Sequence, residues 1–576
     1  MNDIRRTILW VILGFSLVML WDKWQIHNGR QATFFPTPTA TAPAASAPGG
    51  AASATAAASE TATASAVPTA VATAAPAGAG QVPATPGTPA APAAARERVE
   101  VSTDVLKLSF DTAGGSLVRA ELLKNVDLHD PSRHFVLLDE SAERVYLAQT
   151  GLIGAAGLPN HTTVMTAVPG PRQLADGSNT LEVRFESPES GGVKLVKTYT
   201  LTRGSYAIGV KHEVVNAGSA PITPQLYLQL VRDGNKLAGE SSFYSTFTGP
   251  AVYTEAKKYQ KVEFKDIEKN DAKFEKQATN GYVAMVQHYF ASAWLLGDGI
   301  QRDIFARKVS NNLYAVGMIS TLPAVAPGSS LAAESRLFVG PQEEKMLEAL
   351  APGLELVKDY GWLTILAKPL YWLLDKLHSV IQNWGWSIVA LVVLLKIMFY
   401  WLNAKAYASM AKMKAVNPRI QEMRERLKDK PQEMQQAMMK MYKEEKINPL
   451  GGCLPIMIQI PVFIALYWVL LSSVEMRGAP WVGWIKDLSA PDPWYLLPVI
   501  MTMTTMLQTA LNPAPPDPMQ AKLMWFMPLA FSVMFFFFPS GLVLYWITNN
   551  ILSIVQQWII NTRMGVPPQF NLPKFR

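Results

Sequence analysis

Five apolar segments in the last third of the chain restrict its fold more than any other feature. They cover residues 386–402, 453–473, 494–511, 523–538 and 541–560, and none of them contains an acidic residue. Each approaches or reaches the length of about 20 residues with which a helix crosses a bilayer. Because a helix satisfies its own backbone hydrogen bonds in lipid, the segments predict five transmembrane α-helices.

The N-terminus carries a sixth apolar run. Arg5 and Arg6 precede this run, which covers residues 8–21. The charged sequence DKW follows it at 22–24, where a secretory signal peptide would have small residues for cleavage. Residues 1–30 are therefore predicted to be an uncleaved transmembrane anchor, which brings the number of transmembrane helices to six.

A segment of low complexity follows the anchor. Residues 31–95 consist almost entirely of Ala, Pro, Thr, Ser and Gly, and Glu60 is their only charged residue. Such a composition buries too little apolar surface to offset the loss of chain entropy. The segment is predicted to be a disordered linker.

Residues 96–342 have a different pattern, in which apolar and polar residues alternate. Gly114–Gly115 and Gly191–Gly192 lie between alternating runs, where turns between antiparallel strands are expected. The segment is predicted to form an all-β sandwich domain. Its five histidines have neither the spacing of metal ligands nor a nucleophile motif nearby, and the single Cys453 excludes an intrachain disulfide. We predict no catalytic residue, metal or cofactor.

An amphipathic segment, residues 343–385, separates the β domain from the apolar segments. Apolar residues recur at helical spacing from Leu366 to Val380, and polar residues share another side. The segment is predicted to be a helix on the membrane surface. A short transmembrane helix is the alternative, which Lys368, Asp375 and Lys376 disfavour.

Loop charges orient the helices. The connection 403–447 holds 11 Lys and Arg against 6 Asp and Glu, and the connection 473–493 holds two basic and three acidic residues. Because basic loops stay in the cytoplasm, 403–447 is predicted to be cytoplasmic. Counting from it places the β domain outside and both termini inside, including the basic tail 564–576.

The basic loop itself is rich in helix formers, with predicted breaks at Asn417–Pro418 and at Pro431. It is predicted to be a helical hairpin. Its seven methionines offer an adaptable surface to another protein, or they pack one helix on the other; the sequence leaves both alternatives open.

One cation lies inside an apolar segment. Lys396 is near the middle of 386–402, where a buried charge costs about 2.5–3.5 kcal/mol on insertion scales. On this segment alone, the lysine side chain could equally extend to the membrane surface. Polar residues at a similar depth in the other four segments favour an inward orientation. They are Gln459, Thr505, Ser532 and Ser553, with Asn549 and Gln556 on the same face as Ser553.

These residues predict a wet groove that is open to the cytoplasm. A groove with one cation and no carboxylate suits the polar or acidic end of a polypeptide better than coupled transport, which usually needs acids or paired charges. Two other classes remain as alternatives: a small-solute or ion transporter, and a membrane-anchored periplasmic carbohydrate-binding protein.

Four motifs carry a family resemblance. They are NPLGGCLPIMIQIPVFIALYWVL at 448–470, FPSGLVLYWITNNILSIVQQ at 538–557, DYGWL before the first of the five segments and SMAKM after it. In these motifs the chain resembles the YidC membrane protein insertases of Gram-negative bacteria, within the wider Oxa-type family. The resemblance implies a multi-domain inner-membrane protein with an insertase core at 386–563 and a periplasmic all-β supersandwich.

The resemblance also implies a function and partners. It implies an insertase and chaperone, not an enzyme, that acts on nascent membrane proteins alone or with the Sec translocon and its accessory subunits. The hairpin and basic tail would contact the ribosome and the signal recognition pathway, membrane lipid would surround the core, and no specific nucleic acid is implied. The family's groove cation, usually arginine, falls on Lys396. The client-contacting surface falls on Val392, Phe463, Met501, Met534, Tyr545 and Trp546.

Overall fold

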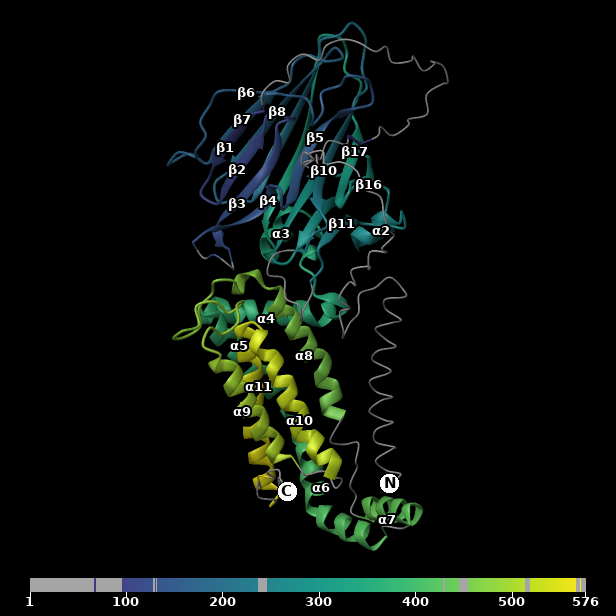
Figure 1. Ribbon diagram of the computed structural model, residues 1–576, viewed down its shortest axis with the longest axis vertical. Coiled ribbons are helices and arrows are strands. Elements are labelled where there is room, and N and C mark those ends of the chain that lie inside the picture. The colour runs from purple at the N-terminus through teal and green to yellow at the C-terminus, as the bar shows by residue number, and fades with distance from the viewer. Residues whose placement is uncertain are drawn as a thin grey trace, which may run out of the picture. The chain divides into compact units, whose positions relative to one another are not determined.

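A computed structural model gives the fold as two compact units, a β unit that ends at Asp359 and a helical unit that begins at Tyr360 (Figure 1). The structure describes residues 67–68, 96–127, 130, 132–236, 246–427, 430–444, 454–512, 518–565 and 570. The predicted anchor, nearly all of the predicted linker and most of the predicted basic tail lie outside these residues.

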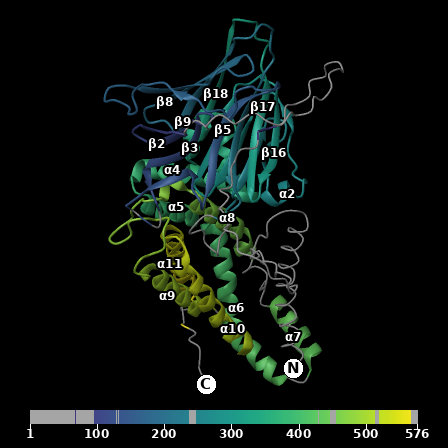
Figure 2. The same ribbon diagram turned by 45° about the horizontal axis from the view of Figure 1, so that its top comes forward.

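The β unit consists of two antiparallel sheets of nine strands each (Figures 1 and 2). The first sheet has the order β1 (Arg98–Ser102), β2 (Leu106–Asp111), β3 (Ser116–Val126), β4 (His134–Glu140), β5 (Val145–Ile153), β10 (Gln225–Asp233), β17 (Leu313–Thr321), β16 (Arg302–Ser310) and β13 (Gln277–Ala278). The second has the order β12 (Lys258–Lys261), β11 (Gly249–Thr254), β14 (Tyr282–Gln287), β15 (Phe290–Leu296), β18 (Ser330–Pro341), β9 (Ala207–Asn216), β8 (Val193–Thr202), β7 (Thr180–Glu186) and β6 (Thr166–Ala167). The predicted all-β sandwich is confirmed.

The two sheets pack on each other through buried side chains. The indole of Trp294 in β15 donates to the carbonyl of Gln229 in β10 at 3.1 Å. Along the outer strand β7 exposed and buried residues alternate, as the sequence predicts, whereas every residue of the central strand β10 is buried. The central strand is therefore covered on both faces, so its burial does not follow the alternation of polar and apolar residues in its sequence.

The turn between β2 and β3 lies where the glycine pair predicts it. Gly114 and Gly115 both adopt positive φ, +67° and +57°. A Cβ on Gly114 would lie 2.3 Å from the Cα of His161, so the turn requires glycine for space as well as for conformation.

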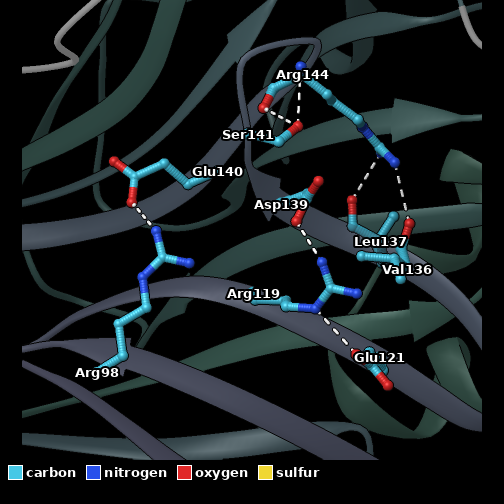
Figure 3. A network of polar contacts seen from close by, with 9 residues as sticks. All are labelled: Arg98, Arg119, Glu121, Val136, Leu137, Asp139, Glu140, Ser141 and Arg144. Atoms are coloured by element: carbon cyan, nitrogen blue, oxygen red, sulfur yellow. Dashed lines mark hydrogen bonds and ion pairs between the residues drawn. The ribbon is translucent and has the colours of Figure 1, made fainter. Parts of the chain in front are cut away.

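Arginine side chains tie the β3–β5 end of the first sheet together (Figure 3). Arg144 donates to the carbonyls of Val136 at 3.0 Å and Leu137 at 2.7 Å, which closes the β4–β5 hairpin. Arg119 in β3 bridges Asp139 at 2.6 Å and Glu121 at 2.9 Å. Because the Arg119 pairs are partly exposed, each is expected to contribute only about 0–1 kcal/mol. Only the pair with Asp139 joins two strands, β3 and β4.

A lysine is fully buried between the sheets. Lys197 in β8 donates to the carbonyls of Gly114 and Thr150, both at 2.7 Å. The Thr150 hydroxyl is 2.9 Å from Nε2 of His212, which is also buried. Burial without a carboxylate partner lowers the pKa of Lys197 from 10.5 to about 7.

We expect Lys197 to make the stability of the β unit rise with pH. Between pH 7 and 10.5 the unfolded chain keeps the proton and the folded chain releases it, so the free energy of unfolding increases across this window. Below pH 7 the folded chain also keeps the proton on Lys197, so the free energy of unfolding is lowered by the full cost of burying the charge. Lys197→Met should make the free energy of unfolding depend less on pH. Pulse proteolysis of the full chain in denaturant from pH 6.5 to 10 measures this dependence.

The matched control for this prediction is Lys194→Met on the same strand. Lys194 is half-exposed and pairs with Glu186 at 2.6 Å. Replacing it should therefore leave the slope of the free energy of unfolding against pH as in the unmodified chain. Equal slopes in the unmodified chain and Lys197→Met would contradict the assignment.

The helical unit is built around one apolar core. Its helices are α4 (Thr364–Ile381), α5 (Trp384–Met398), α6 (Tyr400–Arg426), α7 (Pro431–Glu444), α8 (Leu454–Ser472), α9 (Leu496–Leu511), α10 (Pro518–Met534) and α11 (Ser540–Arg563). α11 packs against both α5 and α9. In both views α6 leads away from the other helices to α7 (Figures 1 and 2).

The helices are short or polar for a membrane crossing when each is taken alone. None of the described helices is by itself both long and apolar enough to span one, whereas the bent pair Trp384–Met398 and Tyr400–Lys412 satisfies the requirement together. The two halves meet at Phe399 at an angle of 68°. The predicted segment 386–402 therefore contains a helix boundary, which hydropathy alone does not reveal.

The predicted surface helix over 343–385 is wrong in its extent. The segment contains α3 (Glu344–Leu350), the 3₁₀ turns η1 (Leu354–Val357) and η2 (Gly361–Leu363), and then α4. Pro352 and Gly353, with φ +76° at the glycine, prevent α3 from continuing. Within α4, Leu370 is buried and Val380 is 82% exposed, so the predicted apolar stripe is divided between two faces.

The predicted helix break at Asn417–Pro418 is also wrong. α6 runs through Pro418 without interruption, and the chain breaks only after Arg426. Val416 and Ile420, on either side of the proline, pack against Met441 of α7. This packing offsets the hydrogen bond that the proline removes. Met423 and Met438 join the same contact, so several of the methionines pack helix on helix.

Candidate functional site

Lys396 lies in the last turn of α5 and is directed towards α11. Its ammonium group donates to the hydroxyl of Ser553 at 2.7 Å, and only 9% of the residue is exposed. Ser553 in turn donates to the carbonyl of Asn549 at 2.7 Å. The five apolar segments contain no acidic residue, and the bond that the structure gives the charged group is to a neutral hydroxyl.

Asn403 joins three helices next to Lys396. Its side-chain oxygen accepts a hydrogen bond from Gln459 of α8, and its amide donates to Gln556 of α11 at 3.3 Å. Gln556 donates to the backbone carbonyl of Lys396, also at 3.3 Å. Together these five residues, Lys396, Asn403, Gln459, Ser553 and Gln556, form what we call the Lys396 cluster, to which α5, α6, α8 and α11 contribute.

Thr505 belongs to a second group of polar residues on the side of α11 that faces α9. Asn550 donates to the hydroxyl of Thr505 at 2.9 Å. Two turns further on, Gln557 donates to the side chain of Asn512 at 3.2 Å. No hydrogen bond described by the structure joins this group to the Lys396 cluster.

Ser532 of α10 is buried and donates to the carbonyl of Pro528 in its own helix at 2.7 Å. Its hydroxyl is therefore satisfied within α10. The structure thus divides the predicted polar set: Gln459, Ser553 and Gln556 lie with Lys396, Asn549 contributes its carbonyl, and Thr505 and Ser532 lie elsewhere.

Sequence reasoning missed Asn403, Asn550 and Gln557. Asn403 was assigned to the start of the basic loop, because the bend at Phe399 is not visible in the sequence. The other two residues carry a signal that was available: Asn549–Asn550 and Gln556–Gln557 are polar pairs seven residues apart. In such pairs on one helix, neighbouring residues point to different sides.

The six predicted client-contacting residues all lie in or against the apolar core. Phe463 of α8 packs edge-on against Trp546 of α11, with ring centroids 4.4 Å apart. Phe463, Met534 and Trp546 are partly buried. Val392, Met501 and Tyr545 are core residues, at most 4% exposed.

No metal site accompanies these residues. Within the part of the chain that the structure describes, no group of three or more His, Cys, Asp or Glu residues is placed to hold a metal ion. The histidines of the β unit are dispersed: His161 contacts the Tyr227 hydroxyl, and His212 contacts Thr150. His129 lies outside the described residues.

Comparison with known proteins first defines the class. The family model described as the YidC periplasmic domain matches residues 98–373, and the model described as 60Kd inner membrane protein matches residues 376–566. The two models together cover most of the chain. They define an inner membrane protein with a periplasmic domain followed by a helical region.

Full-length relatives then define the family. The chain is 57% identical over 569 residues to the membrane protein insertase YidC of Cupriavidus necator, and 56% identical over 564 residues to that of Ralstonia nicotianae. Each alignment covers 98% of both proteins. A crystal structure described as an active YidC insertase with its first transmembrane domain resolved is 19% identical, covers 80% of this chain and 91% of its own, and superposes with a TM-score of 0.36. On the strength of the sequence relatives, the chain belongs to the YidC family of membrane protein insertases.

Proposed function

We propose that the protein inserts newly made proteins into the inner membrane by offering the Lys396 cluster to the polar or acidic end of a client. The observation that carries this mechanism is a lysine among apolar helices whose ammonium group donates to the neutral hydroxyl of Ser553 and whose backbone carbonyl accepts from Gln556. A cation without an acidic partner can attract an incoming carboxylate, and the surrounding amides can replace part of its hydration. The client's apolar helix then moves into lipid.

The membrane placement belongs to the same proposal. The N-terminal anchor and the five apolar segments span the membrane, the β unit is periplasmic, and the α6–α7 hairpin, the basic tail and both termini are cytoplasmic. The outward side chains of α10 support this placement, since Phe526, Leu529, Phe531 and Val533 are all more than half exposed. Apolar exposure on this scale is typical of a surface that faces lipid.

We also propose that Phe463, Met534 and Trp546 contact the client's apolar segment. Their partial burial leaves surface for such a contact. Val392, Met501 and Tyr545 would support these side chains from the core. Edge-to-face packing of Phe463 on Trp546 gives this surface a defined shape without fixing it to one client sequence.

Partners are expected on both sides of the membrane. Larger clients would arrive with the Sec translocon, and the ribosome and signal recognition pathway would bind the α6–α7 hairpin and the basic tail. In the hairpin, Met439 is 59% exposed while Met441 packs on α6, so one methionine remains free for an apolar contact. The function proposed is not enzymatic.

The experiment is the insertion of a single-span client into liposomes that contain only the purified protein. We expect protease-protected client, no solute-dependent current, and persistence of insertion after residues 96–340 are deleted, because the Lys396 cluster lies wholly in the helical unit. Current or solute uptake without insertion would instead favour a transporter. Sugar binding by the chain combined with loss of insertion would favour a carbohydrate-binding protein.

A further inference from the structure

Two residues of the Ala- and Pro-rich linker lie against the β unit. Val67 packs with Ile153, Tyr227, Ile319 and Phe305, four side chains that come from the adjacent strands β5, β10, β17 and β16. Pro68 is buried. At the two linker residues that the structure describes, the chain therefore contacts the sheet well before β1 begins at Arg98.

A polar contact fixes the backbone at the same place. The guanidinium of Arg307 in β16 donates to the carbonyl of Val67 at 3.3 Å. The same guanidinium lies 5.6 Å from the centre of the Phe305 ring, so the ring and the charged group together cover the segment. In β16, Phe305 thus belongs to the apolar cluster that receives the Val67 side chain, and Arg307 binds the Val67 carbonyl.

A surface pocket of about 610 Å³ continues from Pro68. Its lining combines the apolar side chains of Phe305 and Ile319 with the charged side chains of Glu275, Asp303 and Arg307. The pocket leaves room for the chain that precedes or follows the Val–Pro pair. Such a mixture of apolar and polar groups suits a short extended peptide, whose proline lowers the entropy cost of binding.

The linker offers few apolar residues for such a contact. Between residues 36 and 95 the only large apolar residues are Val67, Val71 and Val82. Val82 is also followed by proline, at Pro83, so the linker contains the same dipeptide twice. The structure describes only the first copy, seated on the sheet.

We propose that the β16–β17 face of the β unit is a binding site for an apolar–proline peptide, and that its occupant is the chain's own linker at Val67–Pro68. Docking at Val67–Pro68 leaves residues 31–66, instead of the whole predicted linker 31–95, between the predicted anchor and the first point of attachment to the β unit. The β unit is thereby held by a shorter tether than the full linker would give, so its range of positions is reduced. This inference is independent of the Lys396 cluster.

Distance measurements between spin labels test the docking. In a Cys453→Ser background, labels at Thr69→Cys and Lys308→Cys should give a narrow distance distribution, which broadens when Val67→Asp and Pro68→Gly are added. Changing the second dipeptide, with Val82→Asp and Pro83→Gly, should leave the distribution narrow. A broad distribution in the unaltered linker would overturn the proposal, as would equal broadening by both pairs of substitutions.

Peptide competition tests the site itself. A fluorescent peptide of residues 62–73 should bind the full chain carrying Val67→Asp and Pro68→Gly at least about tenfold more tightly than the unmodified chain, because the attached segment competes at high effective concentration. Adding Arg307→Glu should abolish the gain. Equal affinity for the two chains, or a gain that survives Arg307→Glu, would show that the segment does not occupy this pocket.

Discussion

Lys396→Glu is expected to reduce the insertion of a client with an acidic translocated end by at least about tenfold, an effect of about 1.4 kcal/mol or more. The substitution places a carboxylate where the ammonium group donates to the Ser553 hydroxyl, while the Gln556 amide stays bonded to the backbone carbonyl of the same residue. The new charge repels the client's acidic end instead of attracting it. Insertion is measured as protease-protected client in liposomes that hold the purified variant.

Two variants serve as controls for this result. Lys396→Arg keeps the charge and a donor towards Ser553, and should retain at least about half of the activity although the geometry of its fork differs. Lys412→Glu changes the net charge equally on an exposed position of α6 and should be almost neutral. Equal insertion by all three variants would exclude attraction by Lys396 and leave the family assignment unaffected.

The sequence predicts the parts of this protein whose signals are local. Apolar runs identify the helices that form the core, and alternation identifies outer strands such as β7. The predictions fail where tertiary packing decides. α6 continues through Pro418 because Val416 and Ile420 pack on Met441, and no local signal announces that contact. Likewise β5 pairs with β10 across 71 intervening residues, and that pairing is set by the whole sheet.

The candidate site shows the same division. The sequence places Lys396 and Ser553 at a similar depth in their helices, although they are 157 residues apart, and the structure joins them by a hydrogen bond. Depth could not decide which side of a helix each residue occupies, so Thr505 was grouped with residues from which the structure separates it. The side to which a residue of α9 points depends on how the helix is rotated about its axis. That rotation is set by packing against neighbouring helices such as α11, which the sequence alone does not show.

Asn403→Leu is expected to reduce client insertion by about five- to tenfold. Leucine is similar in size and removes both hydrogen bonds, which leaves the Gln459 amide and the Gln556 carbonyl without their partner. Each buried polar group left unsatisfied costs about 1–3 kcal/mol. We expect α8 and α11 to shift until these groups find other partners, so that the groups around Lys396 no longer hold a polar client segment. The measurement is the same insertion assay, with thermal unfolding in detergent to establish that the variant is folded.

Ser532→Ala is the matched control, because the sequence predicts both Gln459 and Ser532 as groove residues and the structure connects only Gln459 to the Lys396 cluster. Ser532 bonds within its own helix, so its loss should change insertion by less than about twofold. Asn403→Gln keeps a donor and an acceptor on a longer side chain and should restore part of the activity. If Asn403→Leu inserted clients as well as Ser532→Ala does, the hydrogen bonds between helices would have no role in insertion, and the function of the cluster would rest on the charge of Lys396 alone.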